Sequence, residues 1–219
     1  KTSVSRCREQ IMNEKIIKQC GEQLYKALRS RQCIKPLTET YPEITIDDAY
    51  KVSLHLNGLR LADGERVMGK KIGVTSKAVM NMLKVGQPDF GFLTDKMVFS
   101  EGEEVPISGQ LIQPKAEGEI AFILKQDVLG PGITAADVLA ATDFVMAAIE
   151  VVDSRIEDWK LKIQDTVADH ASCGVFILGD RAVDPRDVDL STCGMVVEKN
   201  GDIISTGAGA AALNSPVNC

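Results

Sequence analysis

The stretch Lys115-Ala-Glu-Gly-Glu-Ile-Ala-Phe-Ile-Leu124 places two carboxylates at the start of an apolar segment that is predicted to be a strand. Side chains of a strand alternate between its two faces and rise about 3.3 Å per residue, so Glu117 and Glu119 share a face roughly 6 to 7 Å apart. The apolar residues that follow continue that face toward a core, where unpaired carboxylates are costly. A hard divalent cation, Mg²⁺ or Mn²⁺, would resolve this conflict because it takes oxygen ligands. The alternative is a solvated strand start with Lys115 as the ion-pair partner.

A second apolar segment, Val145-Met-Ala-Ala-Ile-Glu-Val-Val152, is also predicted to be a buried strand and carries a single charge at Glu150. A glutamate inside such a strand needs a partner, and a metal ion shared with Glu117 and Glu119 is a sufficient one. An edge position facing water, or an ion pair with Arg155, is the alternative. The three glutamates are therefore the candidate metal ligands of the chain.

Length and composition limit the classes of protein to which the chain can belong. Its 219 residues can form one substantial core with a smaller helical region beside it. The 25 Lys and Arg residues against 31 Asp and Glu residues give a formal net charge of −6, and no long basic cluster is present, so nucleic acid is not an expected partner. The longest apolar run, 144–152, is too short and too interrupted to span a bilayer, so no membrane association is expected.

The cysteines and the first residues indicate the compartment. Six cysteines are scattered without C-x-x-C spacing, which argues against a zinc ribbon and against a disulfide framework. Residues 1–10 are polar and lack the apolar stretch of a secretory signal. A cytoplasmic location is therefore predicted.

Residues 1–64 are predicted to form an N-terminal helical region, and residues 65–219 a catalytic core of mixed β-structure. Apolar residues recur at helical spacing between Ser5 and about Arg31, and a second helix is expected to begin at a capping box formed by Thr45 and Asp48. The glycines and the proline of the stretch 86–91 indicate a turn-rich loop. Asn200-Gly201 predicts a hairpin near the end of the chain.

A lysine between two glycines, in Gly69-Lys-Lys-Ile-Gly73, is a candidate site residue on a predicted strand. The glycines leave little side chain over the backbone, so another group is expected to approach closely there. Lys71 beside a metal-bound oxoacid could hold a carboxylate or stabilise an enolate, whereas a surface lysine is the plain alternative. His170, in a loop of small residues after Asp169, is left open as a residue that lines the site.

Five short motifs follow one another along the chain. They are Gly69-x-Lys71-x-Gly73-x-Thr75, Gln87-Pro-Asp-Phe-Gly91, Gln113-Pro-Lys-x-Glu-x-Glu119, Glu150-Val-Val-Asp-Ser-Arg155 and Asp165-Thr-Val-Ala-Asp169. Together they resemble the 2-hydroxypenta-2,4-dienoate hydratases of aromatic meta-cleavage pathways, which are related to the 4-oxalocrotonate decarboxylases in the fumarylacetoacetate-hydrolase-like group. The resemblance runs from about Pro36 to Asn218, and the five motifs together are far more specific than any one of them.

The resemblance implies that Glu117, Glu119 and Glu150 bind Mg²⁺ or Mn²⁺ and that Lys71 and Asp89 are catalytic. The implied reaction is the addition of water to 2-hydroxypenta-2,4-dienoate, which gives 4-hydroxy-2-oxopentanoate through an enolate that the metal stabilises. Asp89, with Lys71, is expected to handle the protons. The implied partners are this small-molecule substrate and further copies of the chain in a homo-oligomer. A complex with the sister decarboxylase is a further expectation.

The fold predicted on this basis is α+β, with N-terminal helices before a mixed, bent β-sheet or barrel of the fumarylacetoacetate-hydrolase-like type. Three features depart from the family: His170 stands where Asn is usual, Asn214 stands where Gly is usual, and the chain ends at Cys219 where family members continue with further strands. Two alternative functions therefore stay open. One is a 4-oxalocrotonate decarboxylase, and the other is a catalytically inactive partner subunit of a hydratase or decarboxylase complex.

Overall fold

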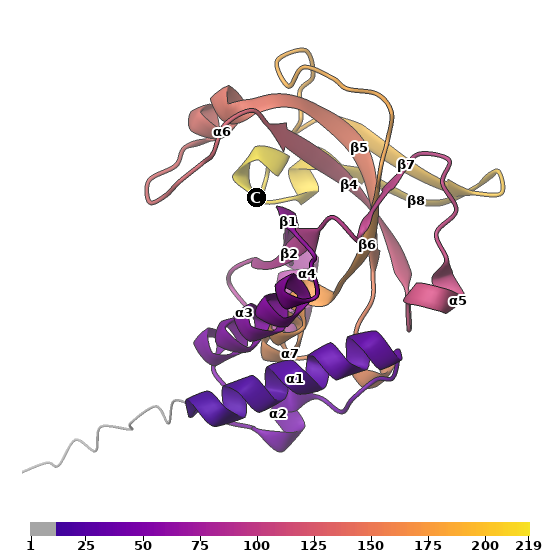
Figure 1. The fold of residues 1–219 in the computed structure, drawn as a ribbon. Coiled ribbons are helices and arrows are strands. Elements are labelled where there is room, and N and C mark those ends of the chain that lie inside the picture. Colours follow the sequence, from indigo (N-terminus) through magenta and orange to yellow (C-terminus); the bar gives the residue numbers. More distant parts are fainter. Residues whose placement is uncertain (1–11) are drawn as a thin grey trace, which may run out of the picture.

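Helices and sheets occupy different ends of the molecule in the computed structural model, which describes residues 12–219 (Figure 1). Helices α1, α2, α3 and α7 gather at one end, and most strands lie at the other, so the predicted combination of helices and sheets is confirmed. The helices are α1 (Glu14–Ser30), α2 (Leu37–Thr40), α3 (Ile46–Ala62), α4 (Lys77–Leu83), α5 (Ile107–Gln110), α6 (Ala135–Ala141) and α7 (Ile163–Ala168). The strands are β1 (Val67–Gly73), β2 (Asp89–Thr94), β3 (Val98–Ser100), β4 (Lys115–Leu124), β5 (Thr142–Val152), β6 (Cys173–Leu178), β7 (Gly194–Lys199) and β8 (Asp202–Ala208).

Two helices, the amphipathic α1 and the more mixed α3, build the apolar core of the helical end. Helix α1 begins after Asn13, whose side chain accepts a hydrogen bond from the backbone of the first turn; the predicted start at Ser5 lies outside the described residues. Helix α3 begins at the predicted capping box of Thr45 and Asp48. Both helices pack with α2 and α7 around one cluster, which includes the buried residues Cys20, Leu24, Ala49, Val52, Leu56 and Val167. Burying each large side chain of this kind stabilises the fold by about 1.5–3 kcal/mol.

None of the helices in residues 12–219 combines the length and the apolar character needed to cross a membrane.

The strands form three separate sheets within the described residues. The largest has the order β3-β6-β5-β4, with β3 parallel to β6 and the other neighbours antiparallel, so the predicted mixed sheet is confirmed. Strands β1 and β2 form an antiparallel pair, and so do β7 and β8. Because β3 and β4 end the four-stranded sheet as unpaired edges in this part of the chain, the barrel allowed by the prediction is not closed.

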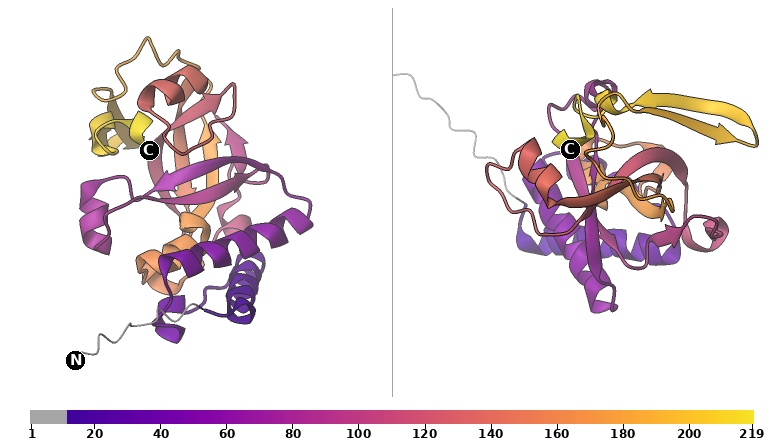
Figure 2. Two further views of the ribbon diagram at one scale, coloured as in Figure 1. Left: turned by 90° about the vertical axis from the view of Figure 1, so that its left-hand side faces the viewer. Right: turned by 90° about the horizontal axis from the view of Figure 1, so that it is seen from above.

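The β7–β8 hairpin lies over the face of β4 instead of pairing with its edge. A Cβ atom added to Gly118 would lie 2.3 Å from Sδ of Met195. Since Cβ atoms point away from the plane of a sheet, this contact places the Met195 side chain of β7 over the face of β4 at Gly118. Asn200 and Gly201 have φ angles of 55° and 88°, the left-handed conformations of the predicted two-residue turn. Figure 2 shows the hairpin, in yellow, projecting from the body.

A buried ion pair joins the helical end to the sheets. Arg155 follows β5, and Asp169 lies at the end of α7; both are buried. Nε of Arg155 donates to Oδ1 of Asp169 at 2.5 Å, and its other nitrogen atoms donate to the backbone carbonyls of Asp153, Asp169 and Cys173. The alternative in which Arg155 pairs with Glu150 is therefore wrong. Arg155 instead forms a joint in the fold, because it links the end of β5 to the end of α7.

Candidate active site

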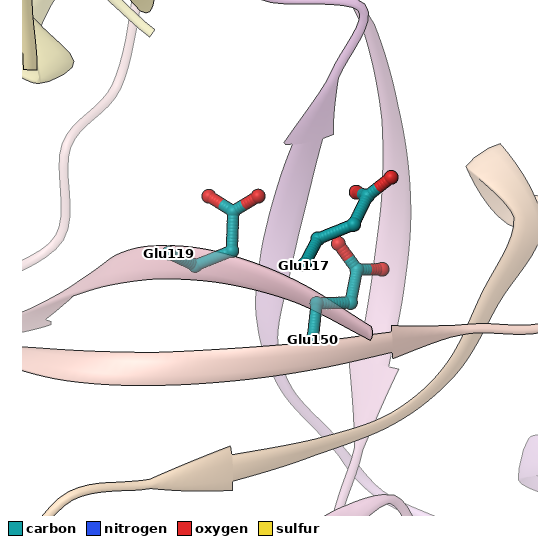
Figure 3. A group of neighbouring side chains, drawn as sticks. All are labelled: Glu117, Glu119 and Glu150. Atoms are coloured by element: carbon teal, nitrogen blue, oxygen red, sulfur yellow. The ribbon is translucent and has the colours of Figure 1, made fainter. Parts of the chain in front are cut away.

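Three carboxylates meet on one face of the β4–β5 pair. Glu117 lies directly opposite Glu150 in the antiparallel ladder, and Glu119 follows Glu117 on the same face of β4. Each residue offers one oxygen, and these three atoms lie within 4.8 Å of one another. Figure 3 shows the three side chains rising from the same side of the two strands. Strand alternation predicts the first two glutamates, and the register of the ladder adds the third.

The three glutamates have the donor chemistry and the spacing of a site for a hard divalent cation. Oxygens on opposite sides of an octahedral Mg²⁺ ion lie about 4.2 Å apart, since each Mg–O distance is about 2.1 Å. Small rotations of the side chains would bring the oxygens into this range. Oε1 of Glu150 is buried and accepts no hydrogen bond; Nζ of Lys71 is 3.2 Å away, so the atom can still take a metal ion as a closer partner. Glu117 and Glu119 are exposed, so water or another molecule can reach the remaining positions.

Like charges and burial raise the pKa values of two of these carboxylates, Glu119 and Glu150. Although solvent reaches Glu119, its pKa is raised to about 7, because the surrounding protein desolvates the carboxylate and Glu150 and Glu117 add negative charge. Burial also raises the pKa of Glu150, against the lowering effect of Lys71. A cation bound among the three carboxylates would remove both penalties. The cluster therefore favours a positively charged ligand.

Lys71 of β1 brings a positive charge to the edge of the three glutamates. Its Nζ lies 3.2 Å from Oε1 of Glu150, an ion pair without hydrogen-bond geometry, and donates a hydrogen bond to the carbonyl of Ala171 at 2.9 Å. The side chain is only 11% exposed, so Lys71 is not a surface lysine. Burial disfavours the ammonium, yet the nearby carboxylates, Glu150 first, raise the pKa of Lys71 above its ordinary value. The residue therefore stays protonated.

Asp89 enters the site from a strand and not from a loop. The predicted turn-rich loop over 86–91 is wrong for its second half, because Asp89 already begins β2 and pairs with Gly73 of β1. A Cβ atom on Gly73 would lie 2.4 Å from Oδ1 of Asp89 and 3.3 Å from Nζ of Lys71. Glycine is therefore required at position 73, and the close approach predicted there is confirmed, with the carboxylate of Asp89 as the approaching group.

The carboxyl group of Asp89 is buried and weakly hydrogen-bonded. Asp89 is 3% exposed, its Oδ1 has no partner, and its Oδ2 accepts a hydrogen bond from the Thr166 hydroxyl at 3.3 Å. Burial raises the pKa of Asp89, against the lowering effects of Lys71 and Thr166. Such a carboxyl group exchanges its proton closer to neutral pH than an exposed aspartate does, which suits general acid–base chemistry.

A strained turn contacts this part of the site. His170, Ala171 and Ser172 have φ angles of 55°, 52° and 54°, in the left-handed region that residues other than glycine usually avoid. The turn presents the Ala171 carbonyl to Nζ of Lys71. Backbone strain of this kind persists only where surrounding contacts hold it, and it is found most often at functional sites.

His170 anchors this turn to helix α3. It is 1% exposed, and its Nε2 lies 2.9 Å from the carbonyl oxygen of Ser53; because a carbonyl only accepts hydrogen bonds, Nε2 carries the proton. The ring also meets Phe92 edge-on, with 5.7 Å between the centroids. Burial lowers the pKa of His170 to about 3, so the ring is neutral. His170, whose role the sequence does not decide, therefore supports the turn 170–172 by fixing it to helix α3.

All five predicted site residues lie in one region, where the carboxylates of β4 and β5 face Lys71 of β1 and Asp89 of β2. Sequence reasoning missed two further contacts, the Thr166 hydroxyl and the Ala171 carbonyl. The only signal for Thr166 is its place inside the motif Asp165-Thr-Val-Ala-Asp169, and a backbone carbonyl leaves no signal in a sequence.

Known proteins of high sequence identity match nearly the whole chain. It is 65% identical over 208 residues to 2-hydroxypent-2,4-dienoate hydratase from Pseudomonas putida, which covers 95% of this chain and 94% of that protein. It is 55% identical to 2-hydroxyhexa-2,4-dienoate hydratase from Comamonas testosteroni, over 93% of this chain and 78% of that protein. No protein-family model matches the chain.

Solved structures share the fold. The structure of 4-oxalocrotonate decarboxylase from Pseudomonas putida G7, complexed with magnesium and adipate, matches with a TM-score of 0.90 at 38% sequence identity, over 94% of this chain and 78% of that one. The same enzyme complexed with calcium and acetate matches with a TM-score of 0.88.

Proposed function

The chain belongs to the 2-hydroxypenta-2,4-dienoate hydratase family, and we propose from this that it adds water to 2-hydroxypenta-2,4-dienoate, giving 4-hydroxy-2-oxopentanoate in aromatic meta-cleavage catabolism. The observation that carries the proposal is the meeting of three carboxylates, a protonated lysine and a buried aspartate at one site. Enolate chemistry needs positive charge near the developing oxyanion and a group that moves a proton. The site offers residues for both tasks.

Glu117, Glu119 and Glu150 are the proposed ligands of one Mg²⁺ or Mn²⁺ ion. Support comes from the buried Oε1 of Glu150, which accepts no hydrogen bond, and from the magnesium and calcium complexes of the decarboxylase that shares the fold. When bound, such an ion supplies Lewis-acid polarisation of a substrate carboxylate and 2-oxygen. The exposure of Glu117 and Glu119 leaves room for these substrate oxygens beside the carboxylates.

Lys71 is proposed to balance the negative charge of the substrate. Its ammonium is held between the Ala171 carbonyl and Glu150, and it keeps its proton. A lysine in this state donates a hydrogen bond to an enolate oxygen, but it does not act as a base. Its role is therefore electrostatic.

Asp89 is proposed to move the protons at the substrate carbons. In the first half of the reaction the 2-hydroxyl proton is lost to solvent and C5 gains a proton, which leaves a C3–C4 double bond conjugated with the 2-oxo group. In the second half the hydroxyl of water adds to C4, and C3 gains a proton from solvent. Asp89 delivers the C5 proton and then, as a carboxylate, accepts the proton released by the attacking water, so it returns to its starting state.

A second candidate function is 4-oxalocrotonate decarboxylation, in which the same site would stabilise the dienolate left by loss of CO₂. The structural match to that decarboxylase supports it. The 65% identity to a hydratase, against 38% to the decarboxylase, favours hydration.

The test supplies both substrates to the purified protein. We expect the ultraviolet absorbance of the dienol to fall when Mg²⁺ or Mn²⁺ is present and to persist in excess EDTA. Release of CO₂ from 2-oxohex-3-enedioate without hydration of the dienol would reverse the choice. Failure of both reactions, together with no Mg²⁺ or Mn²⁺ binding in a calorimetric titration, would favour the inactive partner subunit.

We also propose a fold type, an assembly and a cellular compartment for the protein. We assign the fold to the fumarylacetoacetate-hydrolase-like group, with a core 65–219 and a helical region 1–64, of which the structure describes residues 12–64; the match to the decarboxylase supports the assignment. Light scattering would test the homo-oligomer, and mixing with the sister decarboxylase would test the complex. The five cysteines of the described residues are unpaired, which supports a reducing compartment such as the cytoplasm.

A further inference from the structure

Thr166 holds the carboxyl group of Asp89 from the side of helix α7. Thr166 is 6% exposed, and its hydroxyl lies 3.3 Å from Oδ2 of Asp89 and 3.4 Å from the hydroxyl of Ser172. The other oxygen of Asp89 has no hydrogen-bond partner among the described residues and lies in the space left by the missing side chain of Gly73. The orientation of Asp89 therefore depends on a single side-chain hydrogen bond.

The direction of these hydrogen bonds follows from the donors that are available. When Asp89 is ionised its carboxylate only accepts, so in that state Thr166 donates its one hydroxyl proton to Asp89. The oxygen of Thr166 is then free to accept from the hydroxyl of Ser172. Ser172 belongs to the left-handed turn whose Ala171 carbonyl binds Lys71. The segment 166–172 thus contacts both of the proposed catalytic residues.

We propose that Thr166 is a positioning residue whose hydroxyl fixes the carboxyl group of Asp89 in the orientation from which it exchanges protons with the substrate. The inference rests on the proposed hydratase function and adds a residue outside the five of the site. A small error in the placement of a reacting group can lower a rate about 100-fold, even when the fold is intact. The loss of this hydroxyl should therefore appear in kcat more than in KM.

The test compares the wild type with Thr166→Val, Thr166→Ser and the matched control Thr142→Val. Valine keeps the branched shape of threonine and removes the hydroxyl, whereas serine keeps the hydroxyl. Thr142 is 2% exposed and donates its hydroxyl to the Val138 carbonyl at 2.7 Å, at the junction of α6 and β5. We expect kcat of Thr166→Val to fall about 10- to 100-fold, with KM and Mg²⁺ affinity within about twofold of the wild type. Thr166→Ser should retain kcat within about threefold, and Thr142→Val should retain it fully.

A second readout does not depend on hydratase activity. Carbon-13 NMR of labelled aspartate carboxyl groups, assigned with Asp89→Asn, follows the ionisation of Asp89 against pH. Because a hydrogen bond to the ionised form lowers a pKa, Thr166→Val should raise the Asp89 pKa further, and Thr166→Ser and Thr142→Val should not.

The two readouts separate the two proposals. A wild type that does not hydrate the dienol defeats the proposed function alone, and the NMR titration then decides the role of Thr166. With an active wild type, an unchanged kcat in Thr166→Val, or a Thr166→Ser variant as impaired as Thr166→Val, overturns the positioning role. With an inactive wild type, an unchanged Asp89 pKa in Thr166→Val does so.

Discussion

Two buried charged clusters of this molecule differ in how completely they are paired. At Arg155 and Asp169 one cation meets one anion, and the remaining guanidinium nitrogen atoms donate to backbone carbonyls. At the candidate site three glutamates and Asp89 share one lysine, and buried oxygens of Glu150 and Asp89 have no hydrogen-bond donor. The first cluster stabilises the joint between two parts of the fold, whereas the second is costly until a ligand completes it.

Pairing, and not burial, distinguishes the two clusters. Burial raises the pKa of Asp169 to about 6, even beside Arg155, and desolvation with like charges raises that of Glu119 to about 7. A raised pKa is thus common to a structural carboxylate and to a candidate ligand. Of the two clusters, only the second has buried carboxylate oxygens that accept no hydrogen bond, and such unsatisfied groups are the kind that functional sites retain at the expense of stability.

Breaking the ion pair of Arg155 and Asp169 should have the largest effect, a loss of stability. Arg155→Met leaves the buried carboxylate of Asp169 without its cationic partner and removes the donors of three backbone carbonyls, so the free energy of unfolding should fall by about 3–5 kcal/mol. Urea denaturation measures this change. The control is Arg186→Met, which breaks an ion pair whose arginine side chain is 78% exposed and should cost less than about 1 kcal/mol. Similar losses in the two variants would contradict the assignment of Arg155 as a joint.

Removing the proton donor of the unpaired cluster should affect turnover and not the fold. Asp89→Asn keeps the size of the side chain but cannot exchange a proton, so turnover of the dienol should fall about 10²- to 10⁴-fold. Calorimetric titration should show Mg²⁺ affinity near that of the wild type, since Asp89 is not among the three proposed ligands. Unchanged turnover with intact metal binding would defeat the role of Asp89.

Neutralising one of the crowded carboxylates should stabilise the metal-free protein. Glu119→Gln removes repulsion from Glu150 and Glu117, and after allowance for solvent screening Tm should rise by about 2–4 °C, the shift that about 1 kcal/mol gives in a chain of this size. The same variant should bind Mg²⁺ at least about tenfold more weakly, since it loses a charged ligand. Glu198→Gln, at an exposed position of β7, is the control and should change neither quantity. A lower Tm for Glu119→Gln would show that the carboxylates are not in conflict.

The smallest expected effect is a pH dependence of the stability of the metal-free protein. The folded pKa of Glu119, about 7, lies above the ordinary value of 4.5, so the folded state binds more protons between these values. Stability should therefore decrease as pH rises from about 4.5 to about 7, and this part of the decrease should be absent in Glu119→Gln. Urea denaturation in EDTA at several pH values measures both. Identical pH profiles for the two proteins would exclude Glu119 as the source.

The part of the site that sequence predicts best depends on local geometry and on motifs. Strand alternation with period two is a property of neighbouring residues, so it places Glu117 and Glu119 on one face without any knowledge of the fold. Glu150 is suggested by its cost inside an apolar strand, but its place opposite Glu117 depends on register, which only the ladder shows. Lys71 and Asp89 come from the motif resemblance.

The parts that sequence misses depend on contacts between distant segments. Gly91, at the end of the stretch 86–91, is a residue type typical of loops, yet it lies in β2. Glycine is needed there because a Cβ atom would lie 2.1 Å from the carbonyl oxygen of His170. The left-handed turn 170–172 contains no glycine to announce it. It is held by tertiary contacts such as the one between His170 and Ser53, so neither the turn nor its contact with Lys71 could be predicted.

The direct opposition of Glu117 and Glu150 has a consequence for folding fidelity. A slip of one residue between β4 and β5 would turn every side chain of β4 to the other face, so Glu117 and Glu119 would point away from Glu150. On the proposed metal binding, only the correctly aligned β4–β5 pair offers three ligands to one ion. At 100 times its dissociation constant such an ion stabilises that alignment by about 2.7 kcal/mol over misaligned competitors that do not bind it. The metal would then favour the native register of β4 and β5 during folding, before it takes part in any turnover.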